Sequence, residues 1–75
     1  MTADHSIDTK GRACPMPVLN TKMALNRIAP GETLEVIADD YGSEADIPAL
    51  VRKLGHELLE ATRKDDAFHF LIRKT

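Results

Sequence analysis

Hydrophobic residues recur along this chain with two different spacings, one typical of helices and one typical of strands. Together the two spacings predict the order of the secondary-structure elements. The first has helical spacing, with Val18, Thr21, Leu25 and Ile28 in one stripe and Met23 and Ala24 beside it. This stripe predicts a helix over residues 15–29. The helix is expected to end there because Pro30 and Gly31 follow, and helices usually stop before a proline.

A second stripe of helical spacing follows in the middle of the chain. Its members are Ile47, Leu50, Val51 and Leu54, while Glu44, Arg52 and Lys53 lie off it. Ser43 is interpreted as the N-cap, and Pro48 is placed in the first turn, where proline is tolerated. Gly55 is interpreted as the C-terminal cap. We therefore predict a second helix from about Ser43 to Leu54.

Four other segments alternate with a period of two, which is typical of half-buried strands. They cover residues 5–10, 33–38, 57–63 and 67–72. The polar run Lys64-Asp65-Asp66 separates the last two, so a hairpin is the simplest connection between them.

These elements predict an α/β (α+β) two-layer sandwich in the order β-α-β-α-β-β, as a single domain over residues 1–75. A right-handed crossover makes the first two strands parallel, and both helices cover one face of a four-stranded mixed sheet. The other face is expected to meet water, with a weak partner surface or dimer contact as the alternative. Its outward residues are Glu35, Ile37, Glu60, His69 and Leu71.

Composition and charge exclude several functional classes. With 43% hydrophobic and 29% charged residues, the chain resembles ordinary globular proteins, and no apolar run is long enough to span a membrane. A net charge of −2 provides no field that would attract nucleic acid. The N-terminus has no signal-peptide pattern, and one cysteine cannot form an internal disulfide, so we expect a cytoplasmic protein.

The single cysteine is the strongest candidate for chemistry. In Cys14-Pro15-Met16-Pro17 it stands where the first helix is predicted to begin, since proline is well suited to a first helical turn. The helix dipole and the free amides of Met16 and Val18 favour a thiolate there, and the thiolate is the reactive form. The alternative is a small buried hydrophobic residue, which is the more common role of a lone cysteine.

The chain also resembles a known family. The residues that carry the resemblance are Gly11-Arg12-Ala13-Cys14-Pro15-Met16-Pro17-Val18-Leu19, Pro30-Gly31-Glu32, Ala38-Asp39-Asp40, Asp46-Ile47-Pro48, His56-Glu57-Leu58 and Phe70-Leu71-Ile72-Arg73-Lys74. In this order they are similar to the TusA (SirA-like) sulfur-carrier proteins over nearly the whole length. The resemblance implies a carrier-type sulfurtransferase in which Cys14 accepts sulfane sulfur as a persulfide and passes it on.

The resemblance also implies partners and further site residues. A cysteine desulfurase or a rhodanese-type protein would be the donor, and the acceptor would serve tRNA 2-thiolation, molybdenum-cofactor synthesis or sulfur oxidation. Pro15, Met16 and Pro17 would shape the site. Lys22, Asp40 and Asp46 match charged positions that would dock partners, with ordinary solvated charges as the alternative.

Other kinds of site find little support in the sequence. The three histidines have no metal-ligand spacing with one another or with Cys14, so we expect no metal and no cofactor beyond the covalent persulfide. A monomer without membrane or direct nucleic-acid contact is expected. The alternative from another class is a non-catalytic RNA- or protein-binding regulatory module in which Cys14 is structural.

Overall fold

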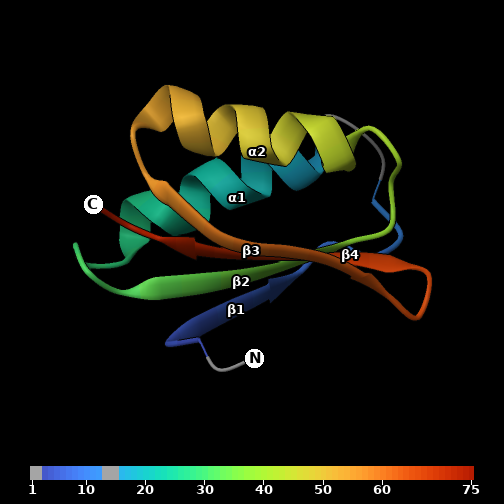
Figure 1. Ribbon diagram of the computed structural model, residues 1–75, viewed down its shortest axis with the longest axis horizontal. Helices are drawn as coiled ribbons and strands as arrows, with labels where there is room; N and C mark the ends of the chain where they lie inside the picture. The colour runs from blue at the N-terminus through green and yellow to red at the C-terminus, as the bar shows by residue number, and fades with distance from the viewer. Residues whose placement is uncertain (1–2, 13–15) are drawn as a thin grey trace.

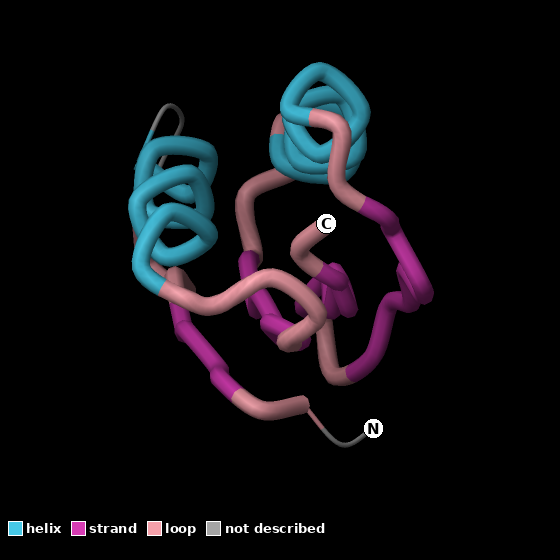
Figure 2. Tube along the Cα trace, turned by 90° about the vertical axis from the view of Figure 1, so that its left-hand side faces the viewer, coloured by secondary structure: helices cyan, strands magenta, loops and turns pink. Residues whose placement is uncertain are grey.

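The computed structural model describes residues 3–12 and 16–75. The elements follow the predicted order: β1 (His5–Asp8), α1 (Met16–Arg27), β2 (Thr33–Ala38), α2 (Ser43–Leu54), β3 (Glu57–Lys64) and β4 (Ala67–Arg73). The sheet order is β1-β2-β4-β3, with β1 parallel to β2 and the other pairs antiparallel. Both helices lie on one face of the sheet, which confirms the predicted two-layer sandwich (Figures 1 and 2).

The core lies between the two helices and the sheet. Strand β2 is central, and its residues alternate between fully buried and half-buried, as a strand with one covered face should. On the bare face, where Glu35 and Ile37 were predicted to lie, Glu35 pairs with Leu71 and Ile37 pairs with His69, and all four are half-buried. The buried apolar cluster comprises Leu25, Ile28, Leu34, Val36, Ala38, Ile47, Val51, Phe68, Phe70 and Ile72.

The start of α2 differs from the prediction. Gly42, with φ −61° and ψ −29°, occupies the N-cap position, and Ser43 is the first helical residue. Because the chain already turns helically at Gly42, the amides of Ser43 and Glu44 donate to the carbonyls of Asp40 and Tyr41 instead of to a side-chain cap. The N-cap role of Ser43 was therefore wrong.

The position of Pro48 was also wrong. Because α2 begins at Ser43, Pro48 is its sixth residue and lies inside the helix, beyond the first turn. The missing amide leaves the carbonyl of Glu44 without its helical donor, but Glu44 is exposed and water can satisfy that carbonyl. The other end is as predicted, since Gly55 closes the helix at φ +80°, in the left-handed region that glycine adopts easily.

The β3–β4 hairpin has the predicted turn and one unpredicted irregularity. Asp65 and Asp66 have φ values of +54° and +62°, so they form a tight turn of the kind that matches strand twist. Between Leu58 and Glu60 the register shifts, which leaves Leu59 as a bulged residue that is 43% exposed. The bulge interrupts the outer edge of the sheet and makes it a poorer template for pairing with another chain.

Glu32 joins the end of α1 to the first strand. Its Oε1 accepts hydrogen bonds from the amide of Ala29 at 2.7 Å and from Nε2 of His5 at 3.1 Å. These bonds favour the charged carboxylate and hold the pKa of Glu32 below its ordinary value of 4.5, with the Ala29 amide as the larger cause.

The pKa of Glu32 predicts a pH-dependent stability. Because the folded pKa is lowered, the stabilisation is present above pH 4.5 and is lost as the pH falls through the folded value. Glu32→Gln should therefore unfold at lower urea concentration than the wild type at pH 7, and this difference should shrink in more acidic buffer. Glu60→Gln is the control, because the Glu60 carboxylate has no partner within residues 3–12 and 16–75. A difference that stays constant down to about pH 3 would contradict the prediction.

Candidate functional site

Two loops and two helix starts meet at one edge of the molecule. Strands β1 and β2 are parallel, so their carboxyl ends lie at the same edge, and each is followed by a helix that runs back across the sheet (Figure 1). The first of these connections carries Cys14. Cys14 and Pro15 lie outside the described residues, so the site is built here from Arg12 on one side and Met16 on the other.

The segment that leads to Cys14 is held firmly to the end of β2. Thr9 is buried, and both its amide and its hydroxyl donate to the carbonyl of Ile37 at 2.7 Å. Two residues later, the amide of Gly11 donates to both carboxylate oxygens of Asp39 at 3.0 and 3.1 Å. Arg12, whose amide donates to the carbonyl of Thr9, is therefore fixed two residues before the cysteine.

The start of α1 is seated in the core by Pro17. Pro17 is buried, and its carbonyl accepts a 2.7 Å hydrogen bond from the buried hydroxyl of Thr21 one turn later. Met16, the first helical residue, is 38% exposed. Of the predicted site-shaping residues, Pro17 thus anchors the helix and Met16 faces solvent.

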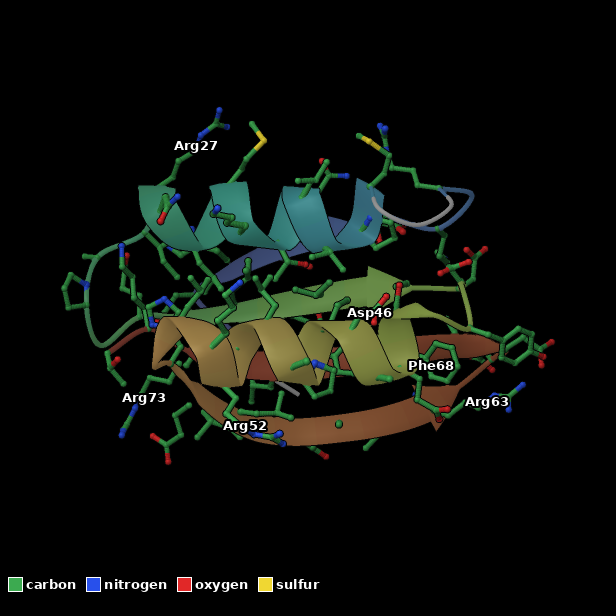
Figure 3. All side chains as sticks on the ribbon, turned by 90° about the horizontal axis from the view of Figure 1, so that it is seen from above. Arg27, Asp46, Arg52, Arg63, Phe68 and Arg73 are labelled. Carbon is green, nitrogen blue, oxygen red and sulfur yellow. The ribbon has the colours of Figure 1, made fainter. Side chains whose placement is uncertain are left out.

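The start of α2 contributes acidic and unsatisfied groups to the same edge. The Oδ2 of Asp40 and the Oγ of Ser43 are buried without a hydrogen-bond partner within residues 3–12 and 16–75. A buried polar atom that lacks a hydrogen-bond partner typically destabilises a fold by about 1–3 kcal/mol. Asp46 lies in the first turn of the same helix and is exposed (Figure 3). The structure therefore brings Asp40 and Asp46 to the edge that carries the cysteine loop.

The electrostatics of the two helix starts differ. Each N-terminus directs unpaired amides and partial positive charge toward the edge. Glu44 and Asp46 offset this charge at α2, whereas α1 has no acidic residue in its first turn. Arg12 adds a positive charge four residues before Met16 in the sequence. The start of α1 is therefore less acidic than the start of α2.

An exposed apolar strip on α1 was not predicted. Met16, Leu19 and Met23 are 38%, 46% and 52% exposed, and their i, i+3, i+7 spacing places them along one side of the helix. The sequence analysis had placed Met23 beside the buried stripe. Lys22 is exposed next to this strip, about 9 Å along the helix axis from Met16. We call Met16, Leu19 and Met23 the α1 strip.

A second unpredicted feature is an aromatic cluster near the start of α2. The ring of Tyr41, which is 73% exposed, meets Phe68 edge-on at 6.1 Å. The guanidinium of Arg63 lies 5.6 Å from the centroids of both rings (Figure 3). Sequence separation hid this cluster, because its members come from the β2–α2 loop, β3 and β4.

Neither a metal centre nor a membrane span is found in the described part of the chain. No group of three or more His, Cys, Asp or Glu residues within 3–12 and 16–75 is arranged to hold a metal ion. No helix in these ranges is long and apolar enough to cross a bilayer.

Comparisons with known proteins converge on one family. The sequence model described as Sulfurtransferase TusA matches residues 5–74. YrkI of Bacillus subtilis is 45% identical over 74 residues, covering 99% of each chain. The sulfur carrier protein TusA of Allochromatium vinosum is 42% identical over 72 residues, covering 96% of this chain and 95% of its own. A SirA-like protein from Desulfitobacterium hafniense has a crystal structure with a TM-score of 0.83 at 27% identity, covering 92% of this chain and 95% of that one.

The contact between Gly11 and Asp39 can be tested directly. Asp39→Ala removes both acceptors of the Gly11 amide, and a hydrogen bond of this kind contributes about 1 kcal/mol, so the free energy of unfolding should fall by that amount. The Gly11 amide should also exchange faster with solvent, measured by hydrogen exchange and NMR. Asp39→Asn keeps one acceptor oxygen and should restore most of the protection. An unchanged Gly11 exchange rate in Asp39→Ala would show that this contact does not hold the loop.

Proposed function

Because the chain belongs to the TusA family of sulfur carrier proteins, we propose that it carries sulfane sulfur as a persulfide on Cys14. The observation that carries this proposal is that Cys14 is the only cysteine among the 75 residues and stands two residues before the first residue of α1. Any thiol chemistry of this chain therefore has a single residue available.

The proposed relay has two transfer steps, each of which exchanges one S–S bond for another. The Cys14 thiolate attacks the outer sulfur of a donor persulfide, a new bond forms between Cys14 Sγ and that sulfur, and the donor cysteine leaves as a thiolate. A thiolate of the acceptor then attacks the outer sulfur held by Cys14, a new S–S bond forms on the acceptor, the bond to Cys14 Sγ breaks, and the Cys14 thiolate is regenerated. No net oxidation occurs, and no internal disulfide competes because the chain has no second thiol.

The surroundings of the cysteine loop support this chemistry. The first turn of α1 has no acidic residue, and Arg12 stands two residues before Cys14 in the sequence, and both features favour the thiolate over the thiol. Met16 and Leu19 are exposed, so the approach along α1 is open to a protein partner. No cofactor is needed, since the persulfide is itself the carried group.

The partners are proposed from the family to which the chain belongs. We propose a cysteine desulfurase or a rhodanese-type protein as donor, and an acceptor in tRNA 2-thiolation, molybdenum-cofactor synthesis or sulfur oxidation. The α1 strip offers an apolar contact, and Lys22 lies beside it, while Asp40 and Asp46 provide acidic groups at the start of α2. These residues together would form the docking surface.

The RNA-binding alternative gains little from the structure. The bare sheet face would be the natural platform, but it carries Glu35 and Glu60 together with half-buried Ile37 and Leu71. Single-stranded nucleic acid is typically bound by basic grooves with aromatic side chains for stacking.

The assignment of Cys14 predicts that loading and folding can be separated. After incubation with a desulfurase and cysteine, mass spectrometry of the non-reduced protein should show the gain of one sulfur atom on the wild type. Cys14→Ser should show no gain yet keep the wild-type circular dichroism spectrum and urea midpoint, because serine is well tolerated at helix starts. Sulfur retained by folded Cys14→Ser would end the carrier proposal, and loss of fold would indicate a structural cysteine.

The docking surface predicts a charge-specific effect on loading. Lys22→Glu should slow sulfur loading by a desulfurase roughly three- to tenfold at low salt, because rim charges act mainly on the rate of encounter. Its matched control is Lys53→Glu, the same change in an exposed residue in the last turn of α2, at the opposite end of the molecule. Alkylation of Cys14 by a neutral reagent should proceed at the same rate in all three proteins. Equal loading rates in Lys22→Glu and wild type would remove Lys22 from the docking surface.

A further inference from the structure

A groove separates the outer edge of β1 from α1. It has a volume of about 440 Å³ and is lined on one side by residues 5–9 and on the other by Asn20, Met23 and Arg27. All four residues of the edge strand β1, and Thr9 after it, thus line a groove whose opposite wall is a helix. The groove shares Arg12 and Met23 with the surface proposed for sulfur transfer, but most of its lining lies along β1 and the last turns of α1.

The edge of β1 has unused backbone hydrogen-bonding groups. Strand β1 is outermost in the sheet and pairs only with β2. Because the amide of Thr9 donates to Ile37 and backbone direction alternates along a strand, residues 5, 7 and 9 face β2. The amides and carbonyls of Ser6 and Asp8 therefore point away from the sheet, spaced as a further strand would require.

The two sheet edges differ in how they are protected. Strand β3, at the other edge, is interrupted by the bulge at Leu59. No proline or bulge interrupts β1, and among residues 5–8 only Asp8 carries a full charge when the histidine is neutral. The usual devices that prevent pairing with another chain are thus weaker on β1, where the groove lies.

The charge of the groove favours an acidic occupant. Arg12 and Arg27 both line it, and neither guanidinium has an ion-pair partner within residues 3–12 and 16–75. Arg12 follows the end of β1, whereas Arg27 is in the last turn of α1, which leads back to the start of β2 beside His5. The two charges therefore stand toward opposite ends of the groove. The carboxylate of Asp8 is already engaged by the Lys10 amide at 2.9 Å and the Lys10 ammonium at 3.8 Å.

We propose that this groove binds an extended acidic segment of a partner protein, which adds to the sheet as a fifth strand beside β1. Its backbone would pair with Ser6 and Asp8, and carboxylates near its two ends would meet Arg12 and Arg27. Strand addition of this kind is a common mode of peptide recognition.

The length of β1 and the alternation of side chains along a strand limit the pattern of residues in the segment. Four residues of strand span about 13 Å, which matches the length of β1. Every second side chain of an added strand faces the helix layer, so the pattern is acidic-x-apolar-x-acidic. The central apolar side chain would contact Met23 and Ala24 on the wall of α1.

A synthetic peptide with the central sequence Glu-Thr-Val-Thr-Glu and blocked ends is the probe. Titrated into the full chain under reducing conditions, it should slow hydrogen exchange at the amides of Ser6 and Asp8, while the Ile7 amide, which already faces β2, should change little. A peptide with both glutamates replaced by lysine should not bind. A peptide with proline at the central position should also fail, because it cannot continue the ladder.

Two arginine variants give the matched comparison. Arg27→Ala should weaken peptide binding roughly tenfold through loss of a charge-assisted contact. Arg52→Ala changes the equivalent arginine in the last turn of α2, which projects from the other side of the molecule, and should bind like the wild type (Figure 3).

The proposal would be overturned by no binding at millimolar peptide, by equal affinity in Arg27→Ala and wild type, or by unchanged exchange at Ser6 and Asp8 in the saturated complex. Competition by free glutamate at the same concentration as the peptide would assign the groove to small anions instead. Tighter binding of an RNA oligonucleotide would likewise reject a peptide as the occupant.

Discussion

The parallel pairing of β1 with β2 is the constraint on which the rest of this molecule depends. Two parallel neighbours cannot be joined by a tight turn, so the chain has to cross over the sheet, and α1 is that crossover. The same pairing places the carboxyl ends of both strands at one edge. Hydrogen bonds from Thr9 to Ile37 and from Gly11 to Asp39 hold the segment after β1 against the end of β2. Without this pairing, the cysteine loop and the start of α2 would not lie at a common edge.

The small size of the chain explains where its chemistry lies. A domain of 75 residues buries only about 60% of its unfolded surface, so its core fills the space between one sheet face and two helices and leaves no room for a deep internal pocket. Arg12 and Met16, the described residues on either side of Cys14, therefore lie at an edge, where helix starts supply amides and partial charge. Such a position suits a carrier, because two different enzymes have to reach the same sulfur atom in turn.

Helix α1 serves three surfaces at once. One side packs Thr21 and Leu25 into the core, the α1 strip is exposed beside Lys22, and the flank with Arg27 forms a wall of the groove along β1. Because 3.6 residues make each turn, neighbouring residues in sequence are distributed among these surfaces. The cysteine loop and the groove meet at Arg12, so a partner segment beside β1 would lie next to the proposed site of sulfur exchange.

The sequence by itself determined the elements and singled out one candidate for the reactive residue. Hydrophobic periods depend only on which face of an element is covered, so the stripe through Leu25, the alternation of β2 and the hairpin were all predicted. Cys14 could be singled out because it is the only thiol and stands next to helix-starting prolines.

What the tertiary structure decided depends on contacts between distant segments. Local propensity placed a cap at Ser43, but the fold continues the turn through Gly42, and it bulges β3 at Leu59. The contact of Gly11 with Asp39 and the groove beside β1 likewise join residues far apart in the chain, and no local pattern encodes which segments will become neighbours.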